Sequence, residues 1–165
     1  MKTDLPAAHP EKLVRSLELK VPPPLVGALL AAAMWAASPT ASRSQRPSFG
    51  VAASIAAAVI GSAFSLAGLA AFRRARTTVN PVKPQSASSL VVSGVYGVTR
   101  NPMYLGLLLL LLAWAAFLWS PWALIGPVAF VAYIDRFQIG PEERALSALF
   151  GDAYASYRRR VRRWL

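Results

Sequence analysis

The longest uncharged stretch of the chain, from Pro102 to Ile134, is the feature that most limits its fold. A single helix of that length would extend for about 50 Å, whereas the hydrocarbon core of a bilayer is about 30 Å thick. The stretch must therefore fold back on itself. Ser120-Pro121 is the expected corner, and Trp119 and Trp122 beside it are typical of aromatic anchors at a membrane interface. We predict a helical hairpin with arms from Pro102 to Trp119 and from Pro121 to Ile134.

Two further apolar runs precede this stretch. Val21 to Ser38 is barely long enough to cross a bilayer, whereas Phe49 to Phe72 is uncharged and would extend for roughly 36 Å as a helix. In the second run, small residues at every fourth position would let another helix approach closely, although an alanine-rich composition alone also explains them. They are Ala53, Ala57, Gly61 and Ser65. Because 55% of the 165 residues are hydrophobic, we predict an all-α polytopic membrane protein with about four transmembrane helices.

Positive charge is concentrated outside the apolar runs. The net charge is +11, and the segment from Arg73 to Arg100 carries five basic residues and no acid. In a chain with several apolar runs, such residues more often set topology and bind membrane lipids than bind nucleic acid. We therefore expect this segment and everything after Asp135 to be cytoplasmic, with both termini on that side of the inner or cell membrane. There is no Cys and one His, His9, so disulfides, thiolate nucleophiles and the usual zinc sites are excluded and no metal site is predicted.

The C-terminal stretch from Glu142 to Leu165 is predicted to be an amphipathic cytoplasmic helix. Apolar residues recur along it at helical spacing, and arginines crowd its C-terminal end. The apolar residues are Leu146, Leu149, Phe150, Ala153, Tyr154, Tyr157, Val161 and Trp164. Such a helix would lie on the membrane surface or over the cytoplasmic ends of the spans. Pro141 suits the first helical position, and Glu142 and Glu143 would then lie in the first turn.

Two polar groups flank the predicted hairpin, and a hairpin would return both to the same cytoplasmic mouth. One group is Tyr96, Arg100, Asn101 and Tyr104; the other is Glu142 and Glu143 with Tyr154 and Tyr157. Carboxylates, aromatic rings and the free N–H groups of a helix start can together bind a polar cofactor. Simpler roles are open as well: helix capping for the acids, interfacial anchoring for the tyrosines and, for Arg100, a topological charge, which the sequence alone favours over a ligand contact.

Both groups lie in motifs that resemble those of a known family. Arg100-Asn101-Pro102-Met103-Tyr104-Leu105-Gly106, preceded by Leu90 to Tyr96, resembles the Arg-His-Pro-x-Tyr-x-Gly signature of the integral-membrane methyltransferases. These include isoprenylcysteine carboxyl methyltransferases and phospholipid N-methyltransferases. Glu142-Glu143, followed by Phe150-Gly151, Tyr154 and Tyr157, is similar to the second signature of that family. The resemblance covers roughly residues 76 to 165. It implies S-adenosyl-L-methionine as cofactor and a lipophilic or small-molecule methyl acceptor.

The resemblance also implies a set of site residues. The implied cofactor contacts are Ser88, Ser89, Leu90, Val91, Tyr96, Asn101, Pro102, Met103, Tyr104, Glu142 and Glu143. The implied catalytic residues are Arg100, Asn101 and Arg136. Arg136 or Arg144 would replace an arginine that related enzymes carry just before the glutamates, near the place of Gln138 here. Asn101 stands where the signature usually has histidine; because asparagine cannot take a proton, an acid–base role there is in doubt. An ionised carboxylate or thiolate acceptor needs no general base. Because the chain has no Cys and no His near the predicted site, this favours the isoprenylcysteine carboxyl methyltransferase branch.

Three other interpretations stay open. The enzyme could methylate the amine of a phospholipid such as phosphatidylethanolamine. A shorter relative of membrane reductases that use a nicotinamide cofactor is a further possibility. The protein could also be a non-catalytic membrane module whose basic C-terminal helix holds anionic lipid. In each case we divide the chain into a polar N-terminal segment (1–20), two N-terminal spans (21–72) and a cofactor-binding region (73–165).

Overall fold

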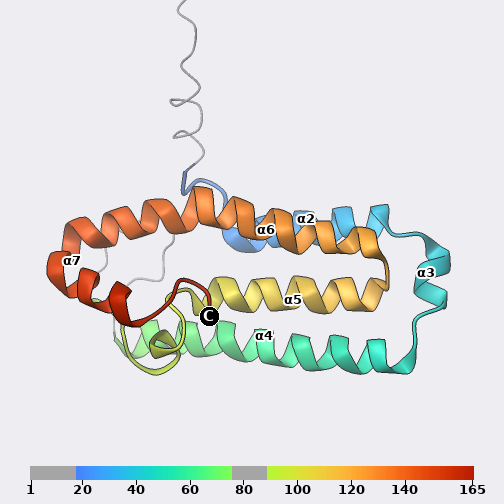
Figure 1. Ribbon diagram of the computed structural model, residues 1–165, viewed down its shortest axis with the longest axis horizontal. Coiled ribbons are helices and arrows are strands. Elements are labelled where there is room, and N and C mark those ends of the chain that lie inside the picture. Colours follow the sequence, from blue (N-terminus) through green and yellow to red (C-terminus); the bar gives the residue numbers. More distant parts are fainter. Residues whose placement is uncertain (1–17, 76–88) are drawn as a thin grey trace, which may run out of the picture.

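The computed structural model describes residues 18–75 and 89–165, and within these ranges the chain is helical and forms no strand. The α-helices are α2 (Pro23–Ala37), α3 (Thr40–Ser44), α4 (Ser48–Arg74), α5 (Pro102–Leu118), α6 (Ile125–Ile134) and α7 (Gly140–Arg160). Shorter turns are the 3₁₀ helices η2 (Gly94–Gly97) and η3 (Pro121–Leu124) and the π-helical η4 (Asp135–Ile139). Helix α5 lies between α4 on one side and α2 with α6 on the other, and α7 extends beyond the bundle (Figure 1).

The predicted hairpin is present. Helix α5 ends where Trp119 adopts a left-handed conformation with φ of 51°, and the next residue, Ser120, is extended. The single turn η3 then leads directly into α6. The corner lies where the sequence predicts it, because the proline after Ser120 cannot continue the preceding helix.

Helices α4 and α5 approach closely through small residues. A Cβ atom added at Gly61 would lie 2.8 Å from the carbonyl oxygen of Gly106, and one added at Gly106 would lie against Ser65. The predicted contact role is therefore confirmed for Gly61 and Ser65, but Ala53 is exposed and the four-residue period is wrong. The buried residues of α4 are Gly50, Ser54, Gly61 and Gly68, the last three at intervals of seven. A seven-residue repeat keeps one face of a helix against its neighbour over several turns.

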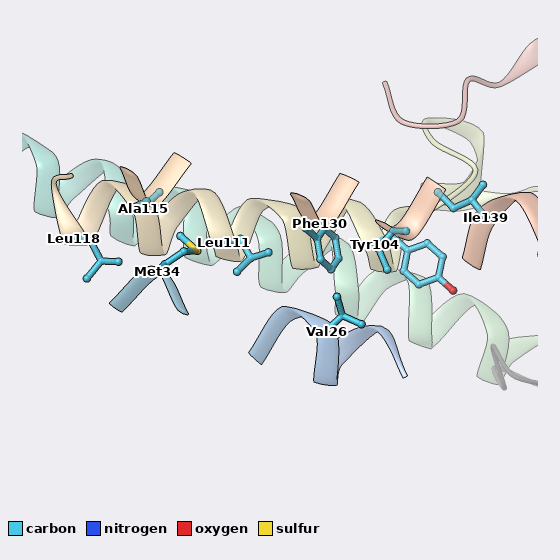
Figure 2. Packing of buried hydrophobic residues seen from close by; sticks show 10 residues of the cluster. Val26, Met34, Tyr104, Leu111, Ala115, Leu118, Phe130 and Ile139 are labelled. Carbon is cyan, nitrogen blue, oxygen red and sulfur yellow. The ribbon is translucent and has the colours of Figure 1, made fainter. Parts of the chain in front are cut away.

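Larger side chains fill the space between α5, α2 and α6. Met34, Leu111 and Phe130 belong to one cluster of buried apolar residues that continues to the end of the bundle (Figure 2). Phe130 is fully buried and lies 4.0 Å from where a Cβ of Gly27 would be. The indole N–H of Trp114 donates to the carbonyl oxygen of Ala31 at 3.0 Å, which ties α5 to α2.

One described helix, α4, is long and apolar enough to cross a membrane by itself. Its outer side chains are not covered by protein: only 11% of its most apolar window is buried, and Val59 and Leu66 are strongly exposed. A core helix of a water-soluble protein would be mostly buried, so this exposure is typical of contact with lipid. Helices α2 and α5 are apolar but shorter, at 15 and 17 residues.

Helix α7 begins at Gly140 with Pro141 in its first turn, close to the predicted start, but α6 leads into it through the π-helical turn η4. The backbone stays in the right-handed helical region at Ile139 and Gly140. Proline has no N–H to offer the carbonyl four residues earlier. That carbonyl, of Phe137, instead accepts the backbone N–H of Leu19 at 3.0 Å. Glu142 and Glu143 lie in the first turn of α7, as predicted.

The predicted C-terminal helix is wrong at its far end. Helix α7 is kinked at Gly151, where φ is 46° and ψ is −121°, and it ends at Arg160. Val161 is extended, and the last five residues fold back toward the start of α5 (Figure 1). Val161 and Trp164 therefore do not extend the apolar side of the helix, because the end of the chain bonds to the segment before α5.

Candidate functional site

A hydrogen bond between Tyr104 and Glu142 joins the two sequence motifs. The Tyr104 hydroxyl donates to Oε1 of Glu142 at 2.5 Å. Tyr104 lies in the first turn of α5 and is 7% exposed, at the end of the apolar cluster with its hydroxyl directed away from the other labelled side chains (Figure 2). Glu142 lies on α7 just after the π-helical turn and is partly buried. The hairpin thus brings the start of the first motif to the first of the tandem acids.

The surroundings of Glu142 change its ionisation. Burial raises the pKa of its carboxyl from 4.5 to about 7; the hydrogen bond from Tyr104 acts against this rise, and neighbouring Glu143 adds to it. Burial also raises the pKa of Tyr154 to about 12 and moves that of Tyr96 further above its usual range. The two phenols therefore stay neutral, while Glu142 can hold or release a proton near neutral pH.

Glu143 is surrounded by arginines. Its Oε1 lies 2.9 Å from Arg100, and both side chains are only 10% exposed. Arg163 donates to Oε1 at 3.2 Å and to Oε2 at 2.7 Å, and Arg158 lies 4.0 Å away. The hydrogen bond to Glu143 raises the pKa of Arg163 further. Both oxygens of Glu143 are thus engaged, and the carboxylate joins the loop before α5, helix α7 and the end of the chain.

The loop from Gly94 to Asn101 is held by three parts of the molecule. The carbonyl oxygen of Tyr96 accepts the Tyr157 hydroxyl at 2.7 Å, and the Tyr96 ring meets Phe72 of α4 edge-on with centroids 5.3 Å apart. The Asn101 side-chain amide donates to the carbonyl oxygen of Arg163 at 2.8 Å. Each contact fixes the loop relative to α4, α7 or the end of the chain.

The other predicted site residues have varied positions. Ser89, Leu90 and Val91 precede the loop and are partly buried, whereas Ser88 lies outside the described residues. Pro102 and Met103 pack against Gly68, where an added Cβ would lie 2.8 Å from Met103 Cγ.

Arg136 lies on the surface, where it is half-exposed and pairs with Glu18 at 2.9 Å. The described ranges contain no group of three or more His, Cys, Asp or Glu residues that could hold a metal ion.

Two residues of this arrangement were missed by the sequence analysis. Thr99 is fully buried and donates from Oγ1 to the carbonyl oxygen of Arg163 at 3.2 Å. Arg163 itself stands in a run of arginines in which composition and spacing do not distinguish it from its neighbours. The one signal in the sequence for this contact was Asn101, because a partly buried side-chain amide needs a carbonyl partner.

Comparison with known proteins places this sequence in a family. A family model described as phospholipid methyltransferase matches residues 49–153, which include α4, α5, α6 and most of α7. An uncharacterized protein of Haemophilus influenzae is 49% identical over 63 residues, which are 38% of this chain and the whole of that relative. No solved structure is significantly similar. The family match covers more than half of the chain and includes the Tyr104–Glu142 pair. The chain belongs to the phospholipid methyltransferase family.

Proposed function

We propose that the protein is an integral-membrane methyltransferase that uses S-adenosyl-L-methionine to methylate a lipid-like or small acceptor. The observation that carries this proposal is the hydrogen bond between Tyr104 and Glu142, because it unites two motifs that are 38 residues apart at one buried, polar position. Membership of a family of methyltransferases supports the reaction type.

The residues around this hydrogen bond fit such a cofactor. Only Oε1 of Glu142 has a hydrogen-bond partner within the described ranges, and a carboxylate suits the ribose hydroxyls or the ammonium group of the cofactor. Arg100 Nε and Ser89 Oγ are buried without partners in the same ranges, so both are open to a ligand. We therefore assign Glu142 as the main cofactor contact, with Ser89, Leu90, Val91, Tyr96 and the segment from Pro102 to Tyr104 beside it.

The chain would contribute orientation and a site that excludes water. S-adenosyl-L-methionine, when bound, supplies a methyl group that its sulfonium makes electrophilic. An ionised carboxylate or thiolate acceptor needs no base. An amine acceptor must first lose a proton, and Glu142, with a pKa of about 7, can accept one. This property and the family description support a second candidate, phospholipid N-methylation, beside carboxyl methylation.

We further propose that α2, α4, α5 and α6 with η3 all cross the membrane, with the site on the cytoplasmic side. Exposed apolar side chains on α2, α4 and α6, such as Leu29, Ile55 and Val128, support contact with lipid. The two arginines at the end of the bundle opposite the site have structural partners. Arg43 donates to the carbonyl oxygen of Ser38 at 3.3 Å, and Arg46 donates to that of Phe117 at 2.7 Å. These bonds satisfy the C-terminal ends of α2 and α5.

Calorimetry with S-adenosylhomocysteine tests the cofactor. Purified protein in detergent should bind the ligand, Glu142→Ala should abolish binding, and Tyr104→Ala should weaken it. Arg159→Ala is the matched control, because this residue is exposed and its side chain forms a hydrogen bond only with Ser156 within the described ranges. A folded wild-type protein that does not bind would refute the proposal and favour a non-catalytic module for anionic lipid.

The acceptor can be identified with S-adenosyl-L-methionine that carries a tritiated methyl group. Protein in vesicles is incubated with lipid extracts or small thiols, and the labelled products are treated with base. Methyl esters release methanol under base, whereas N-methyl and S-methyl products keep their label. Label that is extracted with the phospholipids and stays non-volatile after base would select phospholipid N-methylation; methanol release would select the carboxyl branch.

A further inference from the structure

The last five residues, Val161–Leu165, form a strap over the loop that precedes α5 (Figure 1). The backbone N–H of Arg100 donates to the carbonyl oxygen of Arg162 at 3.0 Å. The carbonyl oxygen of Arg163 accepts two more bonds, from Thr99 Oγ1 at 3.2 Å and from Asn101 Nδ2 at 2.8 Å. Three consecutive residues of the loop are therefore bonded to two carbonyl groups of the strap.

Side chains hold the strap in place as well. Arg163 bonds to both oxygens of Glu143 and lies 3.5 Å from Asp135. Trp164 donates from its indole N–H to Asp135 at 3.3 Å and packs against the apolar cluster of the bundle. The strap thus ties η4, α7 and the loop together at the end of the molecule that contains Glu142.

We propose that the strap helps to form the cofactor site. Asn101 and Arg163 are positioning residues that hold Arg100 and Glu142 in the positions needed to bind the cofactor. This inference rests on the proposed function. Glu143 is adjacent to Glu142 and is shared by Arg100 and Arg163, so loss of Arg163 would loosen both the loop and this part of α7. The strap also lies outside residues 49–153, which match the family model.

The strap gives Asn101 a role that does not require its side chain to take up or release a proton. Its amide N–H donates to a fixed carbonyl, and a histidine ring with a proton on the facing nitrogen can do the same. Aspartate has the same shape as asparagine but presents only oxygen to the Arg163 carbonyl. Position 101 therefore requires a donor, and the residue types allowed there follow from that requirement.

Ligand release from the full chain tests the proposal. We expect Arg163→Ala to weaken S-adenosylhomocysteine binding by about tenfold, mainly through faster dissociation. Arg163→Lys should keep part of the affinity, since lysine retains the charge but not the forked geometry that reaches both oxygens of Glu143. Arg162→Ala is the matched control: its side chain is exposed and its strap contact uses the backbone, so affinity should stay within about twofold.

A second pair of variants examines position 101. Asn101→Asp, which loses the bond to the Arg163 backbone carbonyl, should weaken ligand binding about as much as Arg163→Ala, which loses the side-chain bonds to Glu143. The double variant should be no weaker than either single one, because either loss frees the same strap. Asn101→His should retain affinity. If the wild type does not bind S-adenosylhomocysteine, the proposed function itself fails. If it binds, and if Asn101→Asp and a chain ending at Arg160 lower only the melting temperature while affinity and dissociation rate are unchanged, the strap is structural and the inference is overturned.

Discussion

Ionisation of Glu142 should make binding of S-adenosylhomocysteine depend on pH. Burial raises the pKa of this carboxyl to about 7, and the ligand hydroxyl and ammonium groups would bind its ionised form. Affinity then follows the ionised fraction of Glu142. Between pH 8 and pH 6 this fraction falls from about nine-tenths to about one-tenth, so the dissociation constant should rise about tenfold.

The free protein should show the opposite trend in stability. Between the ordinary pKa of 4.5 and the native value of about 7, folded Glu142 holds a proton that the unfolded chain has lost. The unfolded state binds fewer protons in this window, so the free energy of unfolding falls as pH rises through it, by at most about 3 kcal/mol. Ligand affinity should therefore increase over a pH range in which the stability of the free protein decreases.

Calorimetry and thermal unfolding at pH 6, 7 and 8 measure the two trends. Glu142→Gln should remove both, because glutamine does not titrate. Tyr104→Phe deletes the hydrogen bond that lowers the pKa of Glu142, so the midpoint of the affinity change should move to higher pH. Tyr154, with a pKa of about 12, does not titrate in this window. A flat wild-type profile, or an unchanged slope in Glu142→Gln, would refute the assignment of Glu142.

Two further predictions concern the fold. Gly106→Val should destabilise the protein by about 1–3 kcal/mol in thermal unfolding, because its Cβ would press on the backbone of α4. Gly27→Ala is the control, since the position has room for a Cβ and the change should be tolerated. Equal stability of the two variants would contradict the close contact of α4 and α5. A topology reporter fused after Leu165 should be cytoplasmic, as the arginines beside it require, and a signal from the other side would exclude the proposed orientation.

The hairpin and the meeting of the two motifs followed from the sequence because they depend on length and charge. An uncharged stretch too long for one span must turn, and a turn at Ser120 returns Glu142 to the level of Tyr104. No detail of packing is needed for that step. Predicting the number of membrane spans does require details of packing, since α2 and α5 are shorter than a full crossing and α6 continues into η4 and α7.

The errors arose where backbone groups find partners far away in the sequence. Pro141 lies in the first turn of α7 as predicted, but the sequence did not reveal that α6 leads into this helix or that the Phe137 carbonyl, which proline leaves without a donor, accepts the N–H of Leu19. The arginine-rich end looked helical, but the carbonyls of Arg162 and Arg163 bond to the loop before α5. Main-chain carbonyls are present at every position, so no pattern of side chains reveals which of them will be used.

The tandem acids show how neighbouring identical side chains acquire different tasks. Glu142 faces Tyr104, while Glu143 binds Arg100 and Arg163 and so keeps these cations occupied. In Glu143→Gln the repulsion from a second carboxylate disappears, and the arginines are left with Glu142 as the adjacent acid; both changes favour its ionised form. The midpoint of the pH-dependent affinity should therefore shift below that of the wild type. A midpoint that stays in place would mean that the arginine cluster and Glu142 are electrostatically independent.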